Sequence, residues 1–574
     1  MMNIEQIKKE IFHSLKLVLP DFKGELNFII PPNLEMGDLG IGCFDLSLNS
    51  SKKPEEIAEI LSQKIKPSSV IEKVKNFGPY LNFFLKKDVW FKAILEDILL
   101  AKPGQYKEKD IKDKTILIEF SSPNTNKPQH LGHLRNNSLG MAISNILSEL
   151  GANVIKTNLI NDRGMHIIKA MLAWQKWGER KTPQSEGKKP DHFVGDFYVL
   201  FEKKKEEIPS LVDEAHCLLK KWEEGDPKTI KLWQIINNWA IEGIFETYKK
   251  TGVKFDKIYY ESEIYELGKS IIKKALKKGA AYKREDGAIE IDLGDLGKRV
   301  LLRADKTSVY ITQDIGLAYL RWQEYQPDKM IYVVASEQDH YFQSLFKILE
   351  LLDFPGAKNY YHLSYGIVFL PEGRMKSREG KVVEIDDFIL EMENLAKKEI
   401  STRWPNISSD ELSERALKIA LAAVKFYLLY FKPSRPIIYK PKESISFEGA
   451  TGPYLLYTYA RARSILEKWG KEIDFNDINE IDLSLLKTKE ELKIMESLFF
   501  WPEAIKQSAK NYNPAYLSQA LIKLAQNFNE FYHFHKVIGS EEKLEKARLL
   551  MVNAVCQILK KGLNLLGIET IEKM

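Results

Sequence analysis

The sequence predicts an α/β protein with a central parallel sheet, a small α/β domain before it and an all-helical domain after it. Three observations support this. The apolar run Thr115–Phe120 is followed by a Pro/Asn-rich loop and then by apolar residues at helical spacing, which is typical of a βα unit. Strand-like runs recur up to about residue 385. Beyond that point the pattern is almost entirely helical.

Length and composition are those of a multidomain soluble protein. The 574 residues suffice for about three or four domains, and 44% are hydrophobic and 29% charged. A net charge of +5, from 85 basic and 80 acidic side chains, neither demands nor excludes nucleic acid. We find no signal-peptide core and no apolar run of the ~20 residues that cross a bilayer, which predicts a cytoplasmic protein without a membrane partner.

The cysteines predict free thiols in a reducing compartment. Cys43, Cys217 and Cys556 lie too far apart for a Cys-x-x-Cys zinc site. We therefore expect no zinc.

Residues 1–110 are predicted to form the small α/β domain. It begins with an amphipathic helix, continues through the turn-rich segment Pro31–Gly40, and closes with a strand at Tyr80–Leu85. A linker rich in Lys, Pro and Gly at 101–114 leads into the central domain.

The central domain is predicted at 111–385. After the first strand and a helix that Gly151 ends, a second strand at Asn153–Ile160 leads to Asn161-Asp-Arg-Gly-Met-His166. The stretch 165–287 is helical in pattern and rich in Lys and Glu. We interpret it as an insertion between two halves of the sheet, with its charge runs as solvated helix faces. The remaining strands are predicted at Ala288–Leu293, Ser308–Thr312 and Met330–Ala335.

The loop between the first strand and its helix carries the residues best suited to phosphate chemistry. His130 and His133, with Lys127 close by, are donors for negative charge that develops on a phosphate at a helix N-terminus. Gly132 leaves room for a nucleotide to approach the backbone. Two nearby histidines alone could also be surface residues or metal ligands, so the wider context matters.

That context resembles a known family. His130-Leu-Gly-His133 is similar to the "HIGH" signature of class I aminoacyl-tRNA synthetases, and the full run Glu119–His133 resembles the arginyl-tRNA synthetase form. The resemblance implies a Rossmann-type catalytic domain at 111–385, a tRNA-elbow-binding domain at 1–110 and an anticodon-binding bundle at 386–574. A packing module without RNA contact is an alternative for the first domain.

A second signature follows about 240 residues later. Gly373-Arg-Met-Lys-Ser-Arg-Glu-Gly380 brackets three cationic side chains between glycines and resembles the "KMSKS" loop that closes over the ATP triphosphate. The resemblance implies catalytic roles for Arg374, Lys376 and Arg378 beside His130, His133 and Lys127. It also implies ATP contacts from Met375 and Ser377 in this loop. Ser377 replaces the second class lysine, and Lys127 is the nearest candidate for the missing charge.

Acidic and amide side chains at strand ends suit a planar guanidinium. Tyr310 and Asp314 taken singly would be a core tyrosine and a capping aspartate. The family resemblance implies instead that they hold the guanidinium of arginine, that Glu119 and Gln338 hold the α-amino group, and that two further residues, Ser122 and Asn124, attend the carboxylate.

The helical domain contains a candidate RNA-binding face. Tyr454, Tyr457 and Arg461 fall on or near one face of a predicted helix, and aromatic side chains beside arginine suit stacking on unpaired bases. Aromatics at this spacing are also typical of a core. The resemblance of the segment to the arginyl anticodon-binding bundle implies contact with tRNA.

Together these observations predict an arginine–tRNA ligase that forms arginyl-adenylate from L-arginine and ATP and transfers the arginyl group to tRNA(Arg). Mg²⁺ is expected with the ATP phosphates, without a protein ligand that the sequence identifies, and the protein is expected to be a monomer. The alternatives are another class I synthetase, an adenylate-forming ligase that does not use tRNA, and a non-enzymatic RNA-binding relative.

Overall fold

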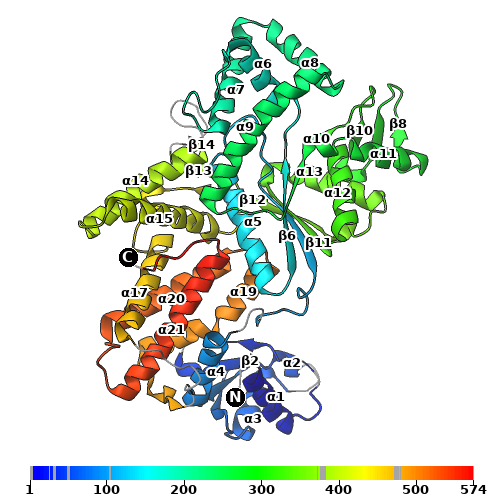
Figure 1. Cartoon of the computed structure of the whole chain (residues 1–574). Helices are drawn as coiled ribbons and strands as arrows, with labels where there is room; N and C mark the ends of the chain where they lie inside the picture. The colour runs from blue at the N-terminus through cyan, green and yellow to red at the C-terminus, as the bar shows by residue number, and fades with distance from the viewer. Residues whose placement is uncertain are drawn as a thin grey trace.

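The computed structural model describes residues 4–22, 24, 26–29, 31, 34–47, 52–101, 105–371, 373–374, 383–470, 478 and 480–572. A parallel sheet lies at the centre of an elongated molecule, with a group of helices at one end and the N-terminal domain at the other (Figure 1). None of the helices in these ranges combines the length and apolar character that crossing a bilayer requires.

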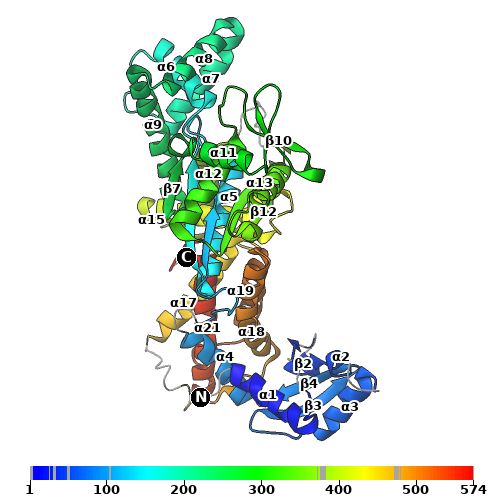
Figure 2. The same ribbon diagram turned by 90° about the vertical axis from the view of Figure 1, so that its right-hand side faces the viewer.

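The N-terminal domain is an antiparallel sheet in the order β1-β2-β4-β3, packed against helices. The predicted first helix and last strand are confirmed as α1 (Ile4–Val18) and β4 (Tyr80–Leu85). On β4, Leu81, Phe83 and Leu85 are buried, as the alternation along a strand requires. The domain projects to one side of the long axis (Figure 2). Its other elements are β1 (Phe28–Ile29), β2 (Leu39–Gly42), α2 (Phe44–Ser47), α3 (Pro54–Lys64), β3 (Ile71–Phe77) and α4 (Lys87–Leu99).

The central sheet has five parallel strands in the order β12-β11-β5-β6-β7. The strand order reverses between β5 and β11, and ligands bind at such switch points beyond the carboxyl ends of the strands. The predicted strands at 115–120, 153–160 and 330–335 are confirmed. The five strands are β5 (Thr115–Glu119), β6 (Asn153–Ile160), β7 (Lys257–Tyr260), β11 (Lys329–Ala335) and β12 (Tyr360–Tyr365).

Helix α5 (Leu131–Glu149) follows β5 and is buried along most of its length. Its Gly140 has no side chain because Phe120 occupies the space: a Cβ there would lie 2.2 Å from the Phe120 ring. This close approach fixes α5 against the end of β5. The N-terminus of α5 is thereby directed at the switch point of the sheet.

The segment 165–287 departs from its prediction in one respect. Four helices confirm the helical pattern: α6 (Met165–Trp177), α7 (Pro190–Glu207), α8 (Ser210–Glu223) and α9 (Pro227–Thr251). The strand β7 lies inside the segment, however, and pairs with β6 as the edge of the central sheet. Four residues are too few for periodicity to separate from the helical pattern around them. Two helices, α10 (Glu261–Ile264) and α11 (Leu267–Lys277), follow β7.

The predicted strand at Ser308–Thr312 is wrong, because helix α12 (Tyr310–Tyr325) begins inside it. Ile311, Ile315 and Ala318 of this helix are buried in a core with β11, so tertiary packing overrides the local alternation. Helix α13 (Asp339–Leu351) follows β11. A small antiparallel sheet precedes α12, and its strands are β8 (Tyr282–Lys283), β9 (Ile289–Asp292), which confirms the strand predicted at 288–293, and β10 (Lys298–Leu302).

The C-terminal part is helical as predicted, with one short exception. The two-residue strand β15 (Ile437–Ile438) pairs with β13 (Val368–Leu370), which also pairs with β14 (Gly373–Arg374). Helices of this part pack on α5 and on the N-terminal domain, where the rings of Trp90 and Phe499 lie 4.7 Å apart. The helices are α14 (Ile385–Arg403), α15 (Ser409–Tyr430), α16 (Pro441–Ser444), α17 (Gly452–Trp469), α18 (Lys489–Phe499), α19 (Trp501–Lys510), α20 (Ala515–Phe534) and α21 (Glu542–Leu565).

Candidate active site

The loop that leaves β5 is held in an unusual conformation. Ser121 and Ser122 both have positive φ angles, 77° and 46°, a region that non-glycine residues rarely occupy. Hydrogen bonds from three elements fix it. Asn136 of α5 accepts from the Ser121 N–H at 2.5 Å, Asn158 of β6 accepts from the Ser122 N–H at 3.0 Å, and the Tyr248 hydroxyl of α9 lies 2.6 Å from Ser121 Oγ.

The two signature histidines cap α5. His130 is the N-cap, and its Nδ1 accepts from the Gly132 N–H at 3.2 Å. Nδ1 of His133 accepts in return from the His130 N–H at 3.2 Å, and the two rings lie 4.0 Å apart. This reciprocal arrangement is a capping box built from imidazoles. Because each Nδ1 acts as an acceptor, Nε2 carries the ring proton of the neutral form.

Both imidazoles are neutral at physiological pH. Burial, together with the nearby positive charge of Lys127, lowers the pKa of His130 to about 4. Burial, His130 and Lys127 lower the pKa of His133 well below its ordinary value. The histidines can therefore donate hydrogen bonds from Nε2 but do not carry charge, and Lys127 is the cation of this loop.

The structure brings the first signature loop next to the residues that follow the second. The Leu131 N–H donates to the Val383 carbonyl at 3.2 Å, and the Ile385 N–H donates to the Gln129 carbonyl at 2.8 Å. Of the predicted second-loop residues, Arg374 lies in β14, where only its backbone is described. Met375, Lys376, Ser377 and Arg378 lie outside the described residues.

A group of carboxylates lines the other side of the switch point. Glu119, the last residue of β5, is buried and paired with the buried guanidinium of Arg321 on α12. The Tyr341 hydroxyl of α13 donates a hydrogen bond to Asp314 on α12. Glu261 begins α10 directly after β7 and is also buried. Strands β5 and β7 and helices α12 and α13 thus bring three carboxyl groups into one neighbourhood.

These carboxyl groups are poised for a cation. Burial raises the pKa of Asp314 to about 7, with a contribution from Glu119, while the Tyr341 hydrogen bond opposes the rise. Burial also raises the pKa of Glu261 to about 7, and the negative charges of Asp162 and Asp314 add to it while Arg163 opposes them. A cation bound beside these groups would favour the ionised form of both, so the pair is suited to a cationic ligand.

The remaining predicted residues lie around this neighbourhood with differing exposure. Tyr310 is the first residue of α12, 72% exposed, and shares a helix face with Asp314 one turn later. Gln338 is exposed at the end of the short helix η3 (Ser336–Gln338), directly after β11. Asn124 and Lys127 are exposed on the loop after β5, whereas Ser122 is half-buried. The arrangement leaves these polar groups free for a ligand at the strand ends.

Sequence reasoning missed Glu261, Arg321 and Tyr341. A signal existed for Arg321, because it follows Asp314 by seven residues and so returns to the same helix face after two turns. Glu261 and Tyr341 gave no such signal. Their positions depend on β7 and on the packing of α13, which periodicity did not show.

The helical domain contains a separate basic hollow of about 590 Å³. The Arg461 guanidinium stacks 4.6 Å from the ring centres of both Tyr457 and Tyr532, and it donates to the Tyr457 hydroxyl at 3.0 Å. Tyr457 and Arg461 are half-buried, and Tyr454, one turn earlier on α17, is half-buried outside the hollow. The predicted aromatic and arginine residues thus meet, with Tyr532 as a partner that the sequence did not identify.

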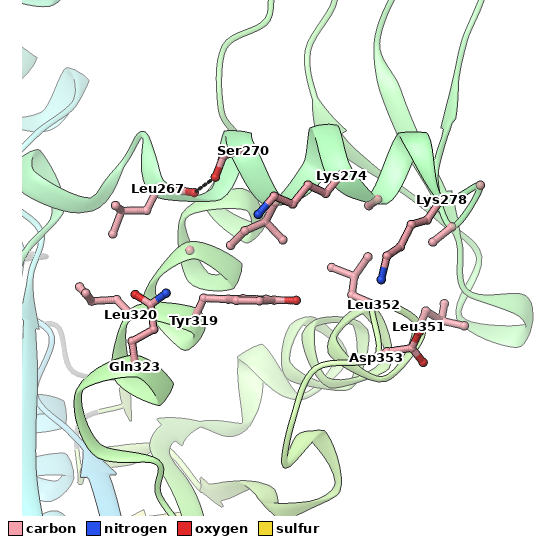
Figure 3. Close-up of a pocket in the computed structure, with 15 residues that line it drawn as sticks. Leu267, Ser270, Lys274, Lys278, Tyr319, Leu320, Gln323, Leu351, Leu352 and Asp353 are labelled. Carbon is pink, nitrogen blue, oxygen red and sulfur yellow. Dashed lines mark hydrogen bonds between the residues drawn. The ribbon is translucent and has the colours of Figure 1, made fainter.

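A larger groove of about 720 Å³ lies between α11, α12 and the end of α13 (Figure 3). Lys274 of α11 and Lys278, directly after this helix, extend over it, and Tyr319 and Gln323 face them from α12. None of the signature-loop residues that the structure describes lines it. Its lining therefore separates it from the histidine loop and the carboxylate neighbourhood.

Three family models match the chain, and together they span most of it. Residues 95–433 match "tRNA synthetases class I (R), catalytic domain", residues 455–574 match the DALR anticodon binding domain, and residues 5–85 match the arginyl tRNA synthetase N-terminal domain. The first of these models alone covers more than half of the chain.

Full-length relatives agree with the family models. An arginine–tRNA ligase of Treponema denticola is 43% identical, over 97% of this chain and 96% of its own length. An arginine–tRNA ligase of Borrelia hermsii is 42% identical, over 96% and 95%. Among solved structures, the Thermus thermophilus arginyl-tRNA synthetase superposes with a TM-score of 0.82 at 26% identity, covering 99% of this chain and all of the other.

Proposed function

The chain belongs to the arginyl-tRNA synthetase family of class I and is an arginine–tRNA ligase, and from this premise we propose how its residues divide the reaction. The assignment rests on two features that lie on either side of one switch point of the sheet. One is the loop with two neutral histidines, and the other is the carboxylate neighbourhood. The first can receive the ATP phosphates, and the second can receive the arginine side chain. The carboxylate of arginine is then near the α-phosphate that it attacks.

The purified chain tests this assignment directly. ATP–pyrophosphate exchange, measured with each of the twenty amino acids and with total tRNA present, should occur with arginine and be at background with lysine. Lysine cannot occupy a bidentate guanidinium site, and such a site rejects it by ~10⁴ or more. Comparable exchange with lysine would contradict the carboxylate pocket as the specificity element.

At the phosphate end, we propose that Nε2 of His130 and of His133 donate to oxygens on which charge develops as the adenylate forms. Lys127 supplies positive charge beside them, together with Arg374, Lys376 and Arg378, and Met375 and Ser377 contact ATP. Gly132 permits the approach of the nucleotide. Neutral donors directed at developing charge act mainly in the transition state.

At the arginine end, we propose that Asp314 and Tyr310 hold the guanidinium and that Glu261 provides the second carboxylate. Glu119, Gln338, Ser122 and Asn124 are proposed to hold the α-amino and carboxylate groups. Arg321 pairs with one oxygen of Glu119 through its Nη2, which orients the carboxylate and leaves the other oxygen for the substrate.

Arginine binding should depend on pH, and Tyr341 should set the pH at which it changes. The ionised carboxylates bind the guanidinium, so kcat/KM for arginine should rise with pH through about 7, where Asp314 and Glu261 titrate as a coupled pair. The Tyr341 hydrogen bond favours the ionised form of Asp314. Tyr341→Phe should therefore move the midpoint to higher pH and lower kcat/KM at pH 6.5 by about tenfold.

The matched control is Tyr319→Phe, which removes a hydroxyl from the same helix as Asp314 but in the separate groove (Figure 3). The charged or titratable groups that influence Asp314 are Glu119, Arg321, Tyr341, Tyr332 and Glu261, and all are unchanged in the control. An identical pH profile in Tyr341→Phe and in the control would show that the hydroxyl does not tune Asp314.

For the RNA half, we propose that the hollow around Arg461 receives an unpaired base of tRNA(Arg). Lys468 and Lys536 line it with Tyr457 and Tyr532, so a base could stack while its phosphates meet positive charge. Tyr454, on the same helix, is proposed to contact the RNA outside the hollow. Residues 1–110 are proposed to bind the tRNA elbow.

The remaining properties follow from these roles. We propose Mg²⁺ bound mainly through ATP phosphate oxygens and no zinc, since the three cysteines lie too far apart in the sequence for a Cys-x-x-Cys site. We propose a monomer, because all the proposed substrate-binding residues come from one chain. We propose that it acts in the cytoplasm. The domain limits proposed are 1–110, 111–385 with the insertion at about 165–287, and 386–574.

A further inference from the structure

A cluster of charged side chains joins the helical insertion to the start of α14. Lys189, the N-cap of α7, places Nζ 2.6 Å from Asp386 Oδ2 and 3.2 Å from Asp191 Oδ2. The same amine donates to Thr247 Oγ1 of α9 at 2.5 Å. The carboxylate of Asp191 is fully buried, and a Cβ on Gly243 of α9 would lie 2.3 Å from it. Lys189 and Asp191 therefore form interior ion pairs, whereas the charge runs of this insertion were predicted to be solvated helix faces.

His192 completes the cluster from the first turn of α7. Its Nε2 lies 3.1 Å from Asp386 Oδ2, and its Nδ1 lies 3.1 Å from Glu384 Oε2. Burial alone would lower the pKa of His192, but the hydrogen bonds to the two carboxylates outweigh burial and raise the pKa to about 10. His192 and Lys189 thus present two positive charges to the start of α14.

The spacing of Asp191, His192 and Asp386 also suits a cation, since one ligand atom from each lies within 4.8 Å of the others. The Lys189 amine already pairs with both carboxylates, however. The protonated His192 ring uses both nitrogens as hydrogen-bond donors and has no lone pair free for a metal. The side chains of the cluster therefore satisfy one another without an ion. Their role lies in the segment of chain that they hold in place.

What it holds is the short segment 383–385, which lies antiparallel to residues 129–131 of the first signature loop. Two backbone hydrogen bonds, at 3.2 and 2.8 Å, flank the bridge between His130 and Glu384. From the other side, Gly195 of α7 packs on the same loop, where a Cβ would lie 2.9 Å from Pro128 Cδ. Helix α7 therefore contacts the histidine loop directly and, through Glu384 and Asp386, by way of its paired strand. Figure 1 shows α7, α9 and α14, the three helices that meet at this cluster.

We propose that Lys189 and His192 are positioning residues for amino-acid activation, which hold segment 383–385 against the loop that carries His130. The inference rests on the proposed role of His130, which the cluster reaches through segment 383–385. A displacement of His130 by about 1 Å is enough to lower a rate strongly when the chemistry depends on alignment. None of the ion pairs that the structure describes in the cluster involves Glu119, Glu261 or Asp314, so loss of the cluster should reduce kcat and leave arginine binding intact.

The test compares two adjacent lysines in the full chain. Lys189→Met should lower kcat for aminoacylation by about tenfold or more and change KM for arginine less than twofold. Lys189→Arg keeps the cation and should restore most of the rate. Lys188→Met is the matched control, because Lys188 pairs with Asp196 at 2.7 Å on the surface, with both side chains more than half exposed. If Lys189→Met does not fold, His192→Gln carries the same comparison.

Three results would overturn the inference. One is an unchanged kcat in Lys189→Met while His130→Ala is strongly impaired, which leaves the proposed function standing. Another is a loss in Lys189→Met that the control shares or that falls equally on KM for arginine, which indicates general destabilisation. A normal kcat in His130→Ala would remove the proposed role of His130 and the positioning role with it.

Discussion

Asp314→Asn should lower kcat/KM for arginine by roughly 30- to 1,000-fold while KM for ATP stays within about twofold. The change removes one charge from the carboxylate neighbourhood but keeps the size of the side chain and the hydrogen bond that Tyr341 donates. Loss of a charge partner in a buried, hydrogen-bonded pair costs on the order of 2–4 kcal/mol. Steady-state aminoacylation with arginine and ATP varied separately measures both quantities.

Asp295→Asn is the control, since this exposed residue lies between β9 and β10, in the small sheet that precedes α12, and loses the same charge. The variant should also lose the pH dependence that Asp314 contributes near pH 7. A weakened ATP affinity with normal arginine dependence would place Asp314 on the nucleotide side of the site and would contradict the proposed pocket.

His130→Ala should lower the rate of arginyl-adenylate formation by ~10²-fold or more, with a modest effect on ATP affinity. The substitution also removes the N-cap of α5, which costs about 0.5–2 kcal/mol of stability. His130→Asn separates the two effects, because an Asn side chain can still accept from the Gly132 N–H but does not extend as far as Nε2 of the imidazole. It should keep the thermal midpoint and recover only part of the rate.

His216→Ala, on the exposed face of α8, is the control for the loss of an imidazole. Because the pKa of His130 is about 4, the rate of the step at saturating substrates should be constant from pH 6 to 8. A fall in ground-state ATP binding equal to the fall in rate would make His130 a nucleotide anchor and not a transition-state donor.

Features that depend on residues close together in the chain could be predicted from the sequence, and features that depend on distant residues could not. The βα unit with His130 and His133 depends on residues that are neighbours in the chain, so periodicity and motif together located it. The carboxylate neighbourhood depends on which strands pair. Glu261 was not found because β7, four residues long inside a helical stretch, gave no period.

Two further differences have other physical causes. At Tyr310, alternating apolar residues indicated a strand, but burial of Ile311 and Ile315 against β11 selects a helix. At Lys189 and Asp191, the charge runs of the insertion indicated solvated helix faces. Their partners Thr247 and Asp386 lie 58 and 197 residues from Lys189 in the chain, so the interior ion pairs could not be read from local composition.

The left-handed conformation of Ser121 and Ser122 affects how much entropy the loop loses when substrates bind. A non-glycine residue in this region costs about 1–2 kcal/mol, and here the cost falls on two consecutive residues. Hydrogen bonds from α5, β6 and α9 offset it when the protein folds, once in the lifetime of the molecule. The loop therefore has little conformational entropy left to lose when the substrates bind, and each catalytic cycle begins from a binding surface that is already ordered.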